Sequence, residues 1–234
     1  MKIRKKVYIC QKKCWTFGYL CAILYYYITR ARRYVMRIES LPSSPHPFSA
    51  NSYLISSRGE YAVVDPTTPF SADMVEGRVK YILLTHAHFD HILEVDSWVR
   101  ETGAEVICSV DELAALSDPM RNCYKLYNGT DNGYFGASRA IDESDTLPLG
   151  DTTISLIRCP GHTIGSATYI CDGCAFVGDT IFEGGGYGRF DLPTGNSVML
   201  VGSIKKLMSL PDDTLVYPGH GGTTTIKQYK LDSR

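Results

Sequence analysis

The chain has 234 residues, of which 44% are hydrophobic and 21% charged, as in a folded α/β domain and unlike a disordered chain. Ten basic residues lie within the first 37 positions, whereas the chain from residue 38 onward holds 14 basic and 25 acidic residues, a net charge of −11. A body this acidic lacks the clustered lysines and arginines that a nucleic-acid groove requires, so we expect no nucleic-acid partner.

Residues 1–37 form an N-terminal extension that differs from the rest of the chain. An apolar run of 14 residues, Trp15 to Ile28, lies between basic flanks, whereas a membrane-spanning helix needs about 20 residues. A membrane anchor and an uncleaved leader both stay open. We favour a third interpretation, in which the working protein starts at Met36, because the sequence from there begins like a first strand and loop. A cytoplasmic protein is therefore expected, with membrane association only if residues 1–35 act as an anchor.

The predicted domain, residues 38–234, alternates β-type runs with helical patterns. β-Branched and aromatic residues between turn signals predict strands at 51–57, 61–65, 80–85, 104–109, 152–159, 166–171, 174–179 and 213–220. Apolar residues at helical spacing predict helices at 92–103, 111–118 and 197–210. Residues 119–140 fit neither pattern and are rich in tyrosine, so we expect a long aromatic loop near a site. Strands and helices in both halves indicate two sheets covered by helices.

The eight cysteines have no regular spacing, and mostly free thiols are expected in a chain of this length. Cys171 and Cys174 form a CxxC pair, a spacing that can bind metal or act in redox chemistry. Asp172-Gly173 between them is typical of a tight hairpin turn. We therefore interpret the two cysteines as neighbours across a turn.

Five of the six histidines follow the end of a predicted strand, in loops rich in glycine or aspartate, and one aspartate is placed in the same way. In chain order these side chains are His86, His88, His91, His162, Asp179 and His220. Loops at strand ends are where α/β scaffolds place their chemistry, so this set predicts a metal centre. His46, the remaining histidine, is expected to be an ordinary loop residue.

The spacing within HAHFDH predicts two metal positions. His86 and His88 are two residues apart and point to the same side of an extended chain. Asp90 and His91 follow where the chain turns into a helix, and they can face a second position beside the first. Imidazole and carboxylate groups without thiolates suit Zn²⁺, and also Fe or Mn. Two divalent metal ions, zinc first, are the predicted cofactors.

HAHFDH resembles the HxHxDH motif of the metallo-β-lactamase superfamily, and PGHTIGS, GDTIF and YPGHGGTTT resemble its later motifs, in the expected order. The resemblance covers roughly residues 38–230. It implies an α/β fold, the four-layer αββα sandwich, with the site at an edge between the sheets. It also implies one metal on His86, His88 and His162, a second metal on Asp90, His91 and His220, and a bridge between them from Asp179.

The resemblance further implies that a water between the two metals loses a proton near neutral pH and becomes the nucleophile. Asp90 is the expected catalytic residue, because it is placed to orient that nucleophile. Thr85 and Asp65 are candidates to hold ligand rings and loops from behind. Residues that could meet the substrate are Tyr124, Lys125, Tyr127 and Arg189, although we interpret Arg189 mainly as an anchor of its own loop.

GRFDLPTGN at 188–196 and LPDDTLVYPGHG are similar to compact bacterial glyoxalase II-like enzymes, which are hydroxyacylglutathione hydrolase-like. A thioesterase acting on a small-molecule thioester or ester is therefore expected. The chain continues 14 residues past His220, so the helical glutathione-binding domain of full-length glyoxalase II enzymes is not expected. His88 stands where diiron flavoproteins have a glutamate, which disfavours that branch.

Three alternatives stay open. A mononuclear-iron persulfide dioxygenase shares the GR-x-D pattern found at Gly188 to Asp191. A lactonase would use the same activated water on another ester. A non-catalytic metal-binding or membrane-tethered interaction protein would keep the scaffold without turnover. Metal content and product analysis distinguish these classes.

Overall fold

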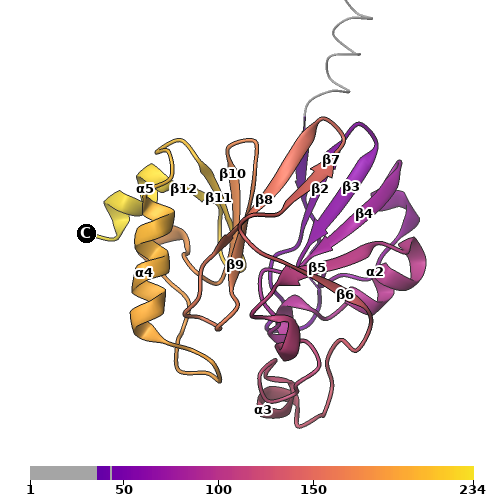
Figure 1. Ribbon diagram of the computed structural model, residues 1–234, viewed down its shortest axis with the longest axis horizontal. Coiled ribbons are helices and arrows are strands. Elements are labelled where there is room, and N and C mark those ends of the chain that lie inside the picture. The colour runs from indigo at the N-terminus through magenta and orange to yellow at the C-terminus, as the bar shows by residue number, and fades with distance from the viewer. Residues whose placement is uncertain (1–35, 43) are drawn as a thin grey trace, which may run out of the picture. The chain divides into compact units, whose positions relative to one another are not determined.

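The computed structural model describes residues 36–42 and 44–234, and the expectations for residues 1–35 lie outside this part. Two six-stranded sheets form its centre (Figure 1). The first sheet contains, in spatial order, β1 (Arg37–Ser40), β2 (Tyr53–Ser57), β3 (Glu60–Val64), β4 (Arg78–Leu83), β5 (Glu105–Ser109) and β6 (Ser138–Ile141). The second contains β12 (Thr224–Thr225), β11 (Leu215–Pro218), β10 (Cys174–Gly178), β9 (Ala167–Cys171), β8 (Thr152–Arg158) and β7 (Thr146–Leu149).

Strand direction brings the loops of interest to one edge. In the first sheet β3, β4, β5 and β6 run parallel, so the end of β4 lies beside the ends of its neighbours. In the second sheet β8 and β10 are each antiparallel to β9, and β11 is parallel to β10. The carboxyl ends of β8, β10 and β11 therefore point the same way. Loops that are distant in sequence meet at these ends.

Helices cover the outer faces of the sheets. The α-helices are α2 (Val95–Thr102), α3 (Tyr124–Asn128), α4 (Ser197–Met208) and α5 (Ile226–Asp232). Short 3₁₀ turns are η1 (Ala72–Met74), η2 (Phe89–His91), η3 (Leu113–Ala115) and η4 (Glu183–Gly185). In Figure 1, α2 lies against the first sheet and α4 and α5 lie against the second. This arrangement is the predicted αββα sandwich.

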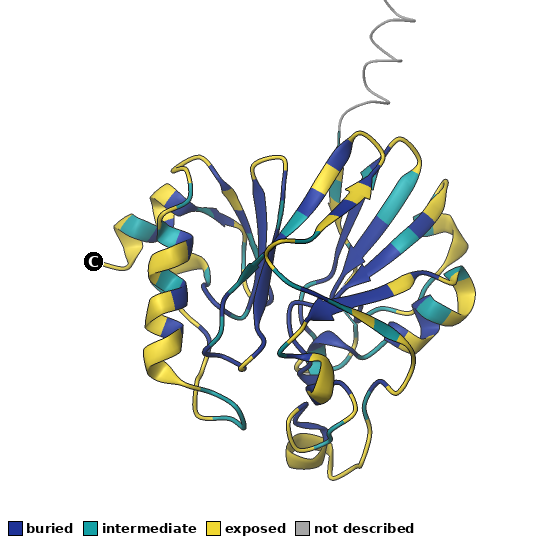
Figure 2. Ribbon diagram, viewed as in Figure 1, coloured by how far each residue is buried: buried dark blue, intermediate teal, exposed yellow. Residues whose placement is uncertain are grey.

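Three apolar clusters fill the layers of the sandwich. Trp98 of α2 packs with Ile82 and Val106 of the first sheet, and Leu207 and Tyr229 pack below the second. Between the sheets lies a third cluster, whose members include Tyr53, Ile55, Leu83, Ile107, Leu147, Ile154, Tyr169 and Phe176. In Figure 2 the central strands of both sheets, such as β5 and β10, are mostly dark blue, that is, buried. Each large side chain buried in this way contributes about 1.5–3 kcal/mol, so the sandwich forms a rigid frame for its edge loops.

The segment 111–140 differs from its prediction. Residues 111–118 were expected to be helical, but only the 3₁₀ turn η3 forms, because the Leu116 carbonyl accepts from the Tyr134 amide instead of continuing a helix. Residues 119–140 were expected to be irregular, yet they contain α3 and the start of β6. Gly129, in the left-handed region at φ 67°, ends α3 after five residues. Strand β7 and helix α5 were not predicted.

The CxxC segment forms the predicted turn. Cys171 and Cys174 are directly opposite each other in β9 and β10. Asp172 and Gly173 both have positive φ, 45° and 77°, as a tight two-residue hairpin requires. The five cysteines of the described residues are all free and buried, which confirms free thiols for this part of the chain. Within residues 36–42 and 44–234, no helix is long and apolar enough to cross a bilayer.

Candidate metal centre

The strand ends bring all seven predicted ligand side chains together. The loop after β4 supplies four of them, and the loops after β8, β10 and β11 supply one each. Their donor atoms form three overlapping groups, in each of which the atoms lie within 4.8 Å of one another. The groups are His86, His88 and His162; His86, His91 and Asp179; and Asp90, His91 and His220.

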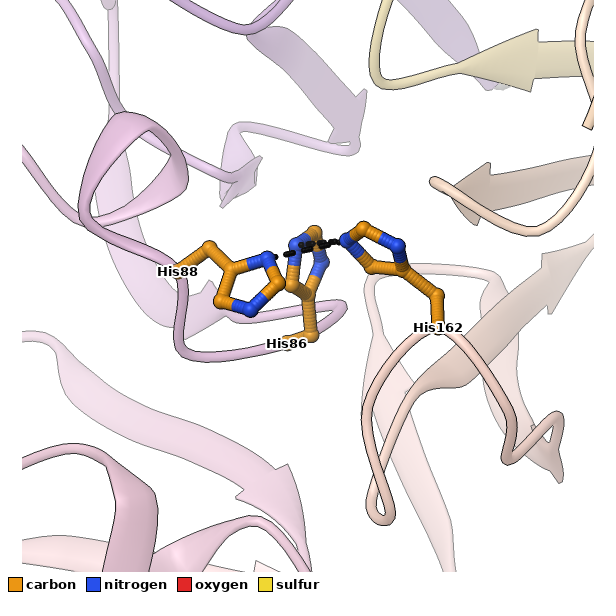
Figure 3. A group of neighbouring side chains, drawn as sticks. All are labelled: His86, His88 and His162. Atoms are coloured by element: carbon orange, nitrogen blue, oxygen red, sulfur yellow. Dashed lines mark hydrogen bonds between the residues drawn. The ribbon is translucent and has the colours of Figure 1, made fainter. Parts of the chain in front are cut away.

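Three imidazoles form the first group, with His86 and His88 from one sheet and His162 from the other (Figure 3). His162 Nε2 lies 3.2 Å from His86 Nε2 and 2.9 Å from His88 Nδ1. On the other side of its ring, His162 Nδ1 lies 2.7 Å from the backbone oxygen of Arg189, which can only accept. The ring proton is therefore on Nδ1, and His162 Nε2 presents a lone pair to the group.

The His86 ring is oriented in the same way. Its Nδ1 lies 3.2 Å from the Thr85 hydroxyl, and this hydroxyl already donates to Asp65 Oδ2 at 2.6 Å. The hydroxyl oxygen is thus left to accept from His86 Nδ1, and His86 Nε2 carries a lone pair. The lone pairs of His86 and His162 face each other at 3.2 Å. This contact is repulsive unless a cation lies between them.

A second metal group, Asp90, His91 and His220, lies beside the first and combines imidazoles with a carboxylate, and Asp179 lies next to it. His91 Nε2 lies 3.3 Å from Asp179 Oδ1 and 4.0 Å from Asp90 Oδ2, and His220 Nε2 lies 3.2 Å from Asp90 Oδ2. Asp179 Oδ2 is 3.6 Å from both His162 Nε2 and His220 Nε2. Asp179 therefore stands between the two groups, where one carboxylate can serve both.

Burial sets the charge state of the first group. Loss of hydration lowers the pKa of His86 well below its ordinary value, and neighbouring histidines lower it further. The same cause lowers the pKa of His88 to about 3 and lowers that of His162. All three rings are therefore neutral at pH 7, the form in which imidazole binds metal.

The second group favours a positive charge. Burial opposes protonation of His91, but the carboxylates of Asp65 and Asp179 outweigh it and raise its pKa well above the ordinary value. Burial likewise works to raise the pKa of Asp179, yet the charge of His91 leaves that pKa well below its usual range. For Asp90, the His220 hydrogen bond and the His91 charge overcome burial and lower the pKa. A proton or a metal ion at His91 Nε2 would each balance the negative charge of the Asp65 and Asp179 carboxylates.

These residues fit divalent metal ions. His91 Nε2 and Asp179 Oδ1 are buried without a hydrogen-bond partner, although buried polar atoms are nearly always satisfied. The donor set holds only nitrogen and oxygen, as suits zinc, iron or manganese. Gly219 packs directly against Asp179 and His91, so that even a Cβ atom would enter the site. The first group would hold one ion and the Asp90 group a second, with Asp179 between them.

A sequence model of the metallo-beta-lactamase superfamily matches residues 46–220, more than half of the chain. The chain belongs to the metallo-beta-lactamase superfamily. The probable metallo-hydrolase YqgX of Bacillus subtilis (strain 168) is 33% identical over 190 residues, covering 77% of this chain and 89% of that protein. The hydroxyacylglutathione hydrolase GloC of Haemophilus influenzae is 30% identical over 205 residues, covering 83% of this chain and 95% of that protein.

A solved structure has a similar fold. TTHA1623 in a di-iron-bound form superposes with a TM-score of 0.70 and 27% identity, covering 82% of this chain and 98% of that one. The family and its relatives support a metal-dependent hydrolase and the predicted fold.

Residues behind the metallo-beta-lactamase motifs hold the ligand loops. Asp65 accepts from the Thr85 amide at 2.8 Å, from the Thr85 hydroxyl at 2.6 Å and from His91 Nδ1 at 2.8 Å. This contact orients the His91 ring with its Nε2 toward the site. Asp65 and Thr85 therefore lie where the sequence placed them, behind the ligands.

The loop that carries His220 is held by residues that the sequence analysis missed. Asn51 donates its side-chain amide to the carbonyls of Pro218 and Gly221, at 3.1 and 2.9 Å, and its backbone amide donates to Gly219 O at 2.7 Å. Tyr53 donates its hydroxyl to Pro218 O at 2.7 Å. The first sheet therefore fixes a ligand loop of the second. An asparagine at the start of a strand was the only sequence signal.

The candidate substrate residues divide into two kinds. Tyr124 is buried against Phe89, and burial raises the pKa of its hydroxyl to about 12, so it is a packing residue. Lys125 pairs with Asp131 at 2.8 Å on the surface. Both side chains are therefore engaged away from the metal ligands.

Arg189 contacts the ligand His162 through its backbone oxygen, and Tyr127 contacts Arg189 and Phe89. The Tyr127 ring, 41% exposed, is 5.4 Å from the Phe89 ring, and its hydroxyl accepts from Arg189 at 3.0 Å. The Arg189 guanidinium also donates to both oxygens of Asp191 at 2.8 Å, and its backbone oxygen holds His162. Arg189 is thus tied into its own loop, as its interpretation as an anchor requires. His46 packs its ring against Phe89 and belongs to none of the metal groups.

Removing metal is expected to lower the thermal stability of the protein. A ligand at about 1,000 times its Kd contributes about 4 kcal/mol to a native state that binds it. For a domain of this size, we expect Tm to fall by about 8–16 °C when a chelator strips the metal. Differential scanning calorimetry with and without chelator measures the shift. A variant lacking His88 and His91 should show no chelator-dependent shift, and an unchanged wild-type Tm would contradict the metal assignment.

Proposed function

We propose that this chain is a glyoxalase II-like thioesterase that hydrolyses a small-molecule thioester with two divalent metal ions. One observation carries the proposal: at the edge between the sheets Asp179 Oδ2 lies 3.6 Å from His162 of the first donor group and 3.6 Å from His220 of the adjoining one. The relationship to GloC along 95% of that protein's length supports the thioester as substrate. Zinc is the proposed metal, and the di-iron form of TTHA1623 makes iron the alternative.

When bound, the two ions would lower the pKa of a water and polarise the substrate carbonyl. The residues then have separate tasks. Asp90 is the ligand carboxylate at the mouth of the site, with 15% of its side chain exposed, so it can hold a proton of the attacking water. Its lowered pKa keeps it ionised for this task at neutral pH. A thiolate is a good leaving group, so the reaction does not need a strong general acid.

An aromatic wall beside the ligands supports a small organic substrate. Phe48, 53% exposed, lies 5.8 Å from Tyr127 and 6.4 Å from Phe89, measured between ring centroids. Phe89 stands between the ligands His88 and Asp90 in sequence. Exposed aromatic faces next to polar catalytic groups are typical of small-molecule sites. We propose that the acyl or thiol portion of the substrate lies against this wall.

The test combines metal analysis with turnover. The full chain, produced with its metal, is assayed for hydrolysis of S-lactoylglutathione, for opening of a lactone, and for oxidation of a persulfide in the presence of oxygen. Two metals per chain and thioester hydrolysis would support the proposal. One iron and sulfite production would replace it with a dioxygenase, and lactone opening alone with a lactonase. Bound metal without any turnover would indicate a binding protein.

Truncating the aromatic wall is expected to weaken substrate binding. Tyr127→Ala removes the ring that lies against Phe89 and with it one face of the proposed substrate contact, and an aromatic contact to a bound group contributes about 0.5–1.5 kcal/mol. We therefore expect KM for the thioester to rise about two- to tenfold with a smaller change in kcat. Phe135→Ala, which removes an aromatic ring 67% exposed in the same segment, is the control. Equal effects of the two substitutions would contradict the wall as a substrate contact.

The proposed setting is the cytoplasm. The five described cysteines are free thiols, as is usual in a reducing compartment. Intact mass of the protein made in its own host tests the related proposal that the working protein starts at Met36. A full-length mass would contradict it.

A further inference from the structure

A buried glutamate lies behind the first metal group, outside the set of proposed ligands. Glu112 follows β5 and is only 1% exposed. Its Oε1 accepts from the Ala87 amide at 2.9 Å. Its Oε2 accepts from the Gly165 amide and from the Thr163 hydroxyl, both at 2.9 Å. A carboxylate has no proton to donate, and here each oxygen is matched to donors only.

The three donors come from the two loops that carry the first metal group. Ala87 lies between His86 and His88 in the loop after β4. Thr163 and Gly165 follow His162 in the loop after β8, which belongs to the other sheet. Glu112 is therefore a connection between the two loops whose imidazoles must converge.

The loop after β8, which carries His162, lies very close to the Glu112 carboxylate. At Gly165 a Cβ atom would overlap the Glu112 backbone nitrogen and its carboxylate, so only glycine allows the contact. Thr163 is fixed as well, because its amide donates to Ser166 Oγ at 3.0 Å and its hydroxyl lies 2.8 Å from the same atom. Both features are independent of the hydrogen bonds to Glu112 itself.

Other residues orient the ligands of the second metal group. Asp65 orients His91, and Asn51 fixes the loop of His220. Glu112 has no hydrogen bond to the loop of His220, and it meets the loop of His91 only at Ala87, between the first-group ligands His86 and His88. The loop of His162 is therefore held by Glu112 and the loop of His220 by Asn51, whereas Asp65 reaches both groups, through His91 and through Thr85 and His86.

We propose that Glu112 is a positioning residue for the first metal site: it ties the HAHFDH loop to the PGHTIGS loop and so sets the affinity of that site. The inference rests on the proposed two-metal assignment. It predicts that changes at Glu112 weaken the first site selectively, whereas changes at Asn51 weaken the second.

The decisive variant is Glu112→Gln. Glutamine keeps the size of the side chain but replaces one acceptor oxygen by an NH₂ group, which then faces an N–H or O–H donor. One of the two loops must lose its contact. Residues that orient metal ligands typically change affinity by about 10–100-fold, so a loss of this size is expected at the first site.

Variants that retain only one complete metal group show which site Glu112→Gln weakens. In a His220→Ala background the first group stays complete, and in a His162→Ala background the second does. Zn²⁺ affinity is measured in each by competition with a chromophoric chelator, with and without Glu112→Gln. We expect a 10–100-fold loss in the first background and less than a threefold change in the second. Asn51→Ala should give the opposite pattern.

Two further variants keep the test decisive if Glu112→Gln does not fold. Gly165→Ala separates the loop from Glu112 without changing charge, and Thr163→Val removes one of the three donors. Both should weaken the first site in the same selective way, Thr163→Val less than Gly165→Ala. Equal losses at both sites, or unchanged affinity in a folded Glu112→Gln protein, would overturn the inference. Because the readout is metal binding, a wild-type protein that binds two ions but lacks thioesterase activity would count only against the proposed function.

Discussion

Replacing Asp90 with asparagine is expected to lower kcat/KM for the thioester by about 10²- to 10⁴-fold, the range that a positioned proton acceptor contributes. Asp90 Oδ2 lies 3.2 Å from His220 Nε2 at the open side of the metal centre. An amide has nearly the same shape, but its neutral oxygen is a weaker hydrogen-bond acceptor for the attacking water and a poorer metal ligand. It also removes a negative charge that faces His91 and His220. Asp90→Asn is therefore expected to lower kcat/KM far more than it lowers the free energy of unfolding.

The measurement needs both a stability readout and a matched control. Asp212→Asn makes the same chemical change at an exposed aspartate that pairs with Lys230 on α5, at 2.6 Å. Urea unfolding should give free energies within about 0.5 kcal/mol of the wild type for this control, as for most surface substitutions. Its activity should be unchanged. If Asp90→Asn retains near-normal turnover with its metals bound, the proposed role of Asp90 is wrong.

Asp65→Asn is expected to weaken the second metal site by about 10–100-fold and to destabilise the fold by about 1.5–3 kcal/mol. The Asp65 carboxylate receives three donors and orients His91. An amide can accept from only part of this set, because its NH₂ group must face one of the donors. Asparagine tolerates the positive φ of 47° at this position, so the loss is due to hydrogen bonding rather than to backbone strain.

Asp172→Asn is the matched control for this prediction. It has nearly the same backbone conformation, with φ 45°, but lies in the exposed turn between β9 and β10. Metal affinity in a His162→Ala background and urea unfolding of both variants are compared. Asp172→Asn should change neither quantity measurably. Equal losses in the two variants would show that the effect comes from the aspartate conformation and not from the orientation of His91.

Features that depend on residues close together in the chain could be predicted from the sequence. His86 and His88 are close in sequence, and their loop follows an apolar strand, so their shared orientation could be inferred from spacing. His162, Asp179 and His220 could be grouped with them because each follows a strand. The sandwich followed from the alternation of strands and helices, and from the resemblance carried by the motifs.

The supports of the site could not be found in this way, because their partners are distant in the chain. Glu112 contacts Ala87 and Thr163, 25 and 51 residues away. In DELAALSD it looks like a solvent-facing helix residue, and only the folded structure shows it buried. Asn51 acts on a loop 167 residues later. Strand β7 was missed because TLPL is short and contains a proline, which does not favour a strand.

The division of the first metal group between two sheets has a consequence for exchange. His86 and His88 are attached to one sheet and His162 to the other, so an ion held by all three would be a removable cross-link between the layers. Escape of that ion requires the loops, and with them the sheet edges, to separate briefly. We expect the lifetime of the bound ion to follow the opening rate of the sandwich, so a core substitution far from the ligands would accelerate metal loss.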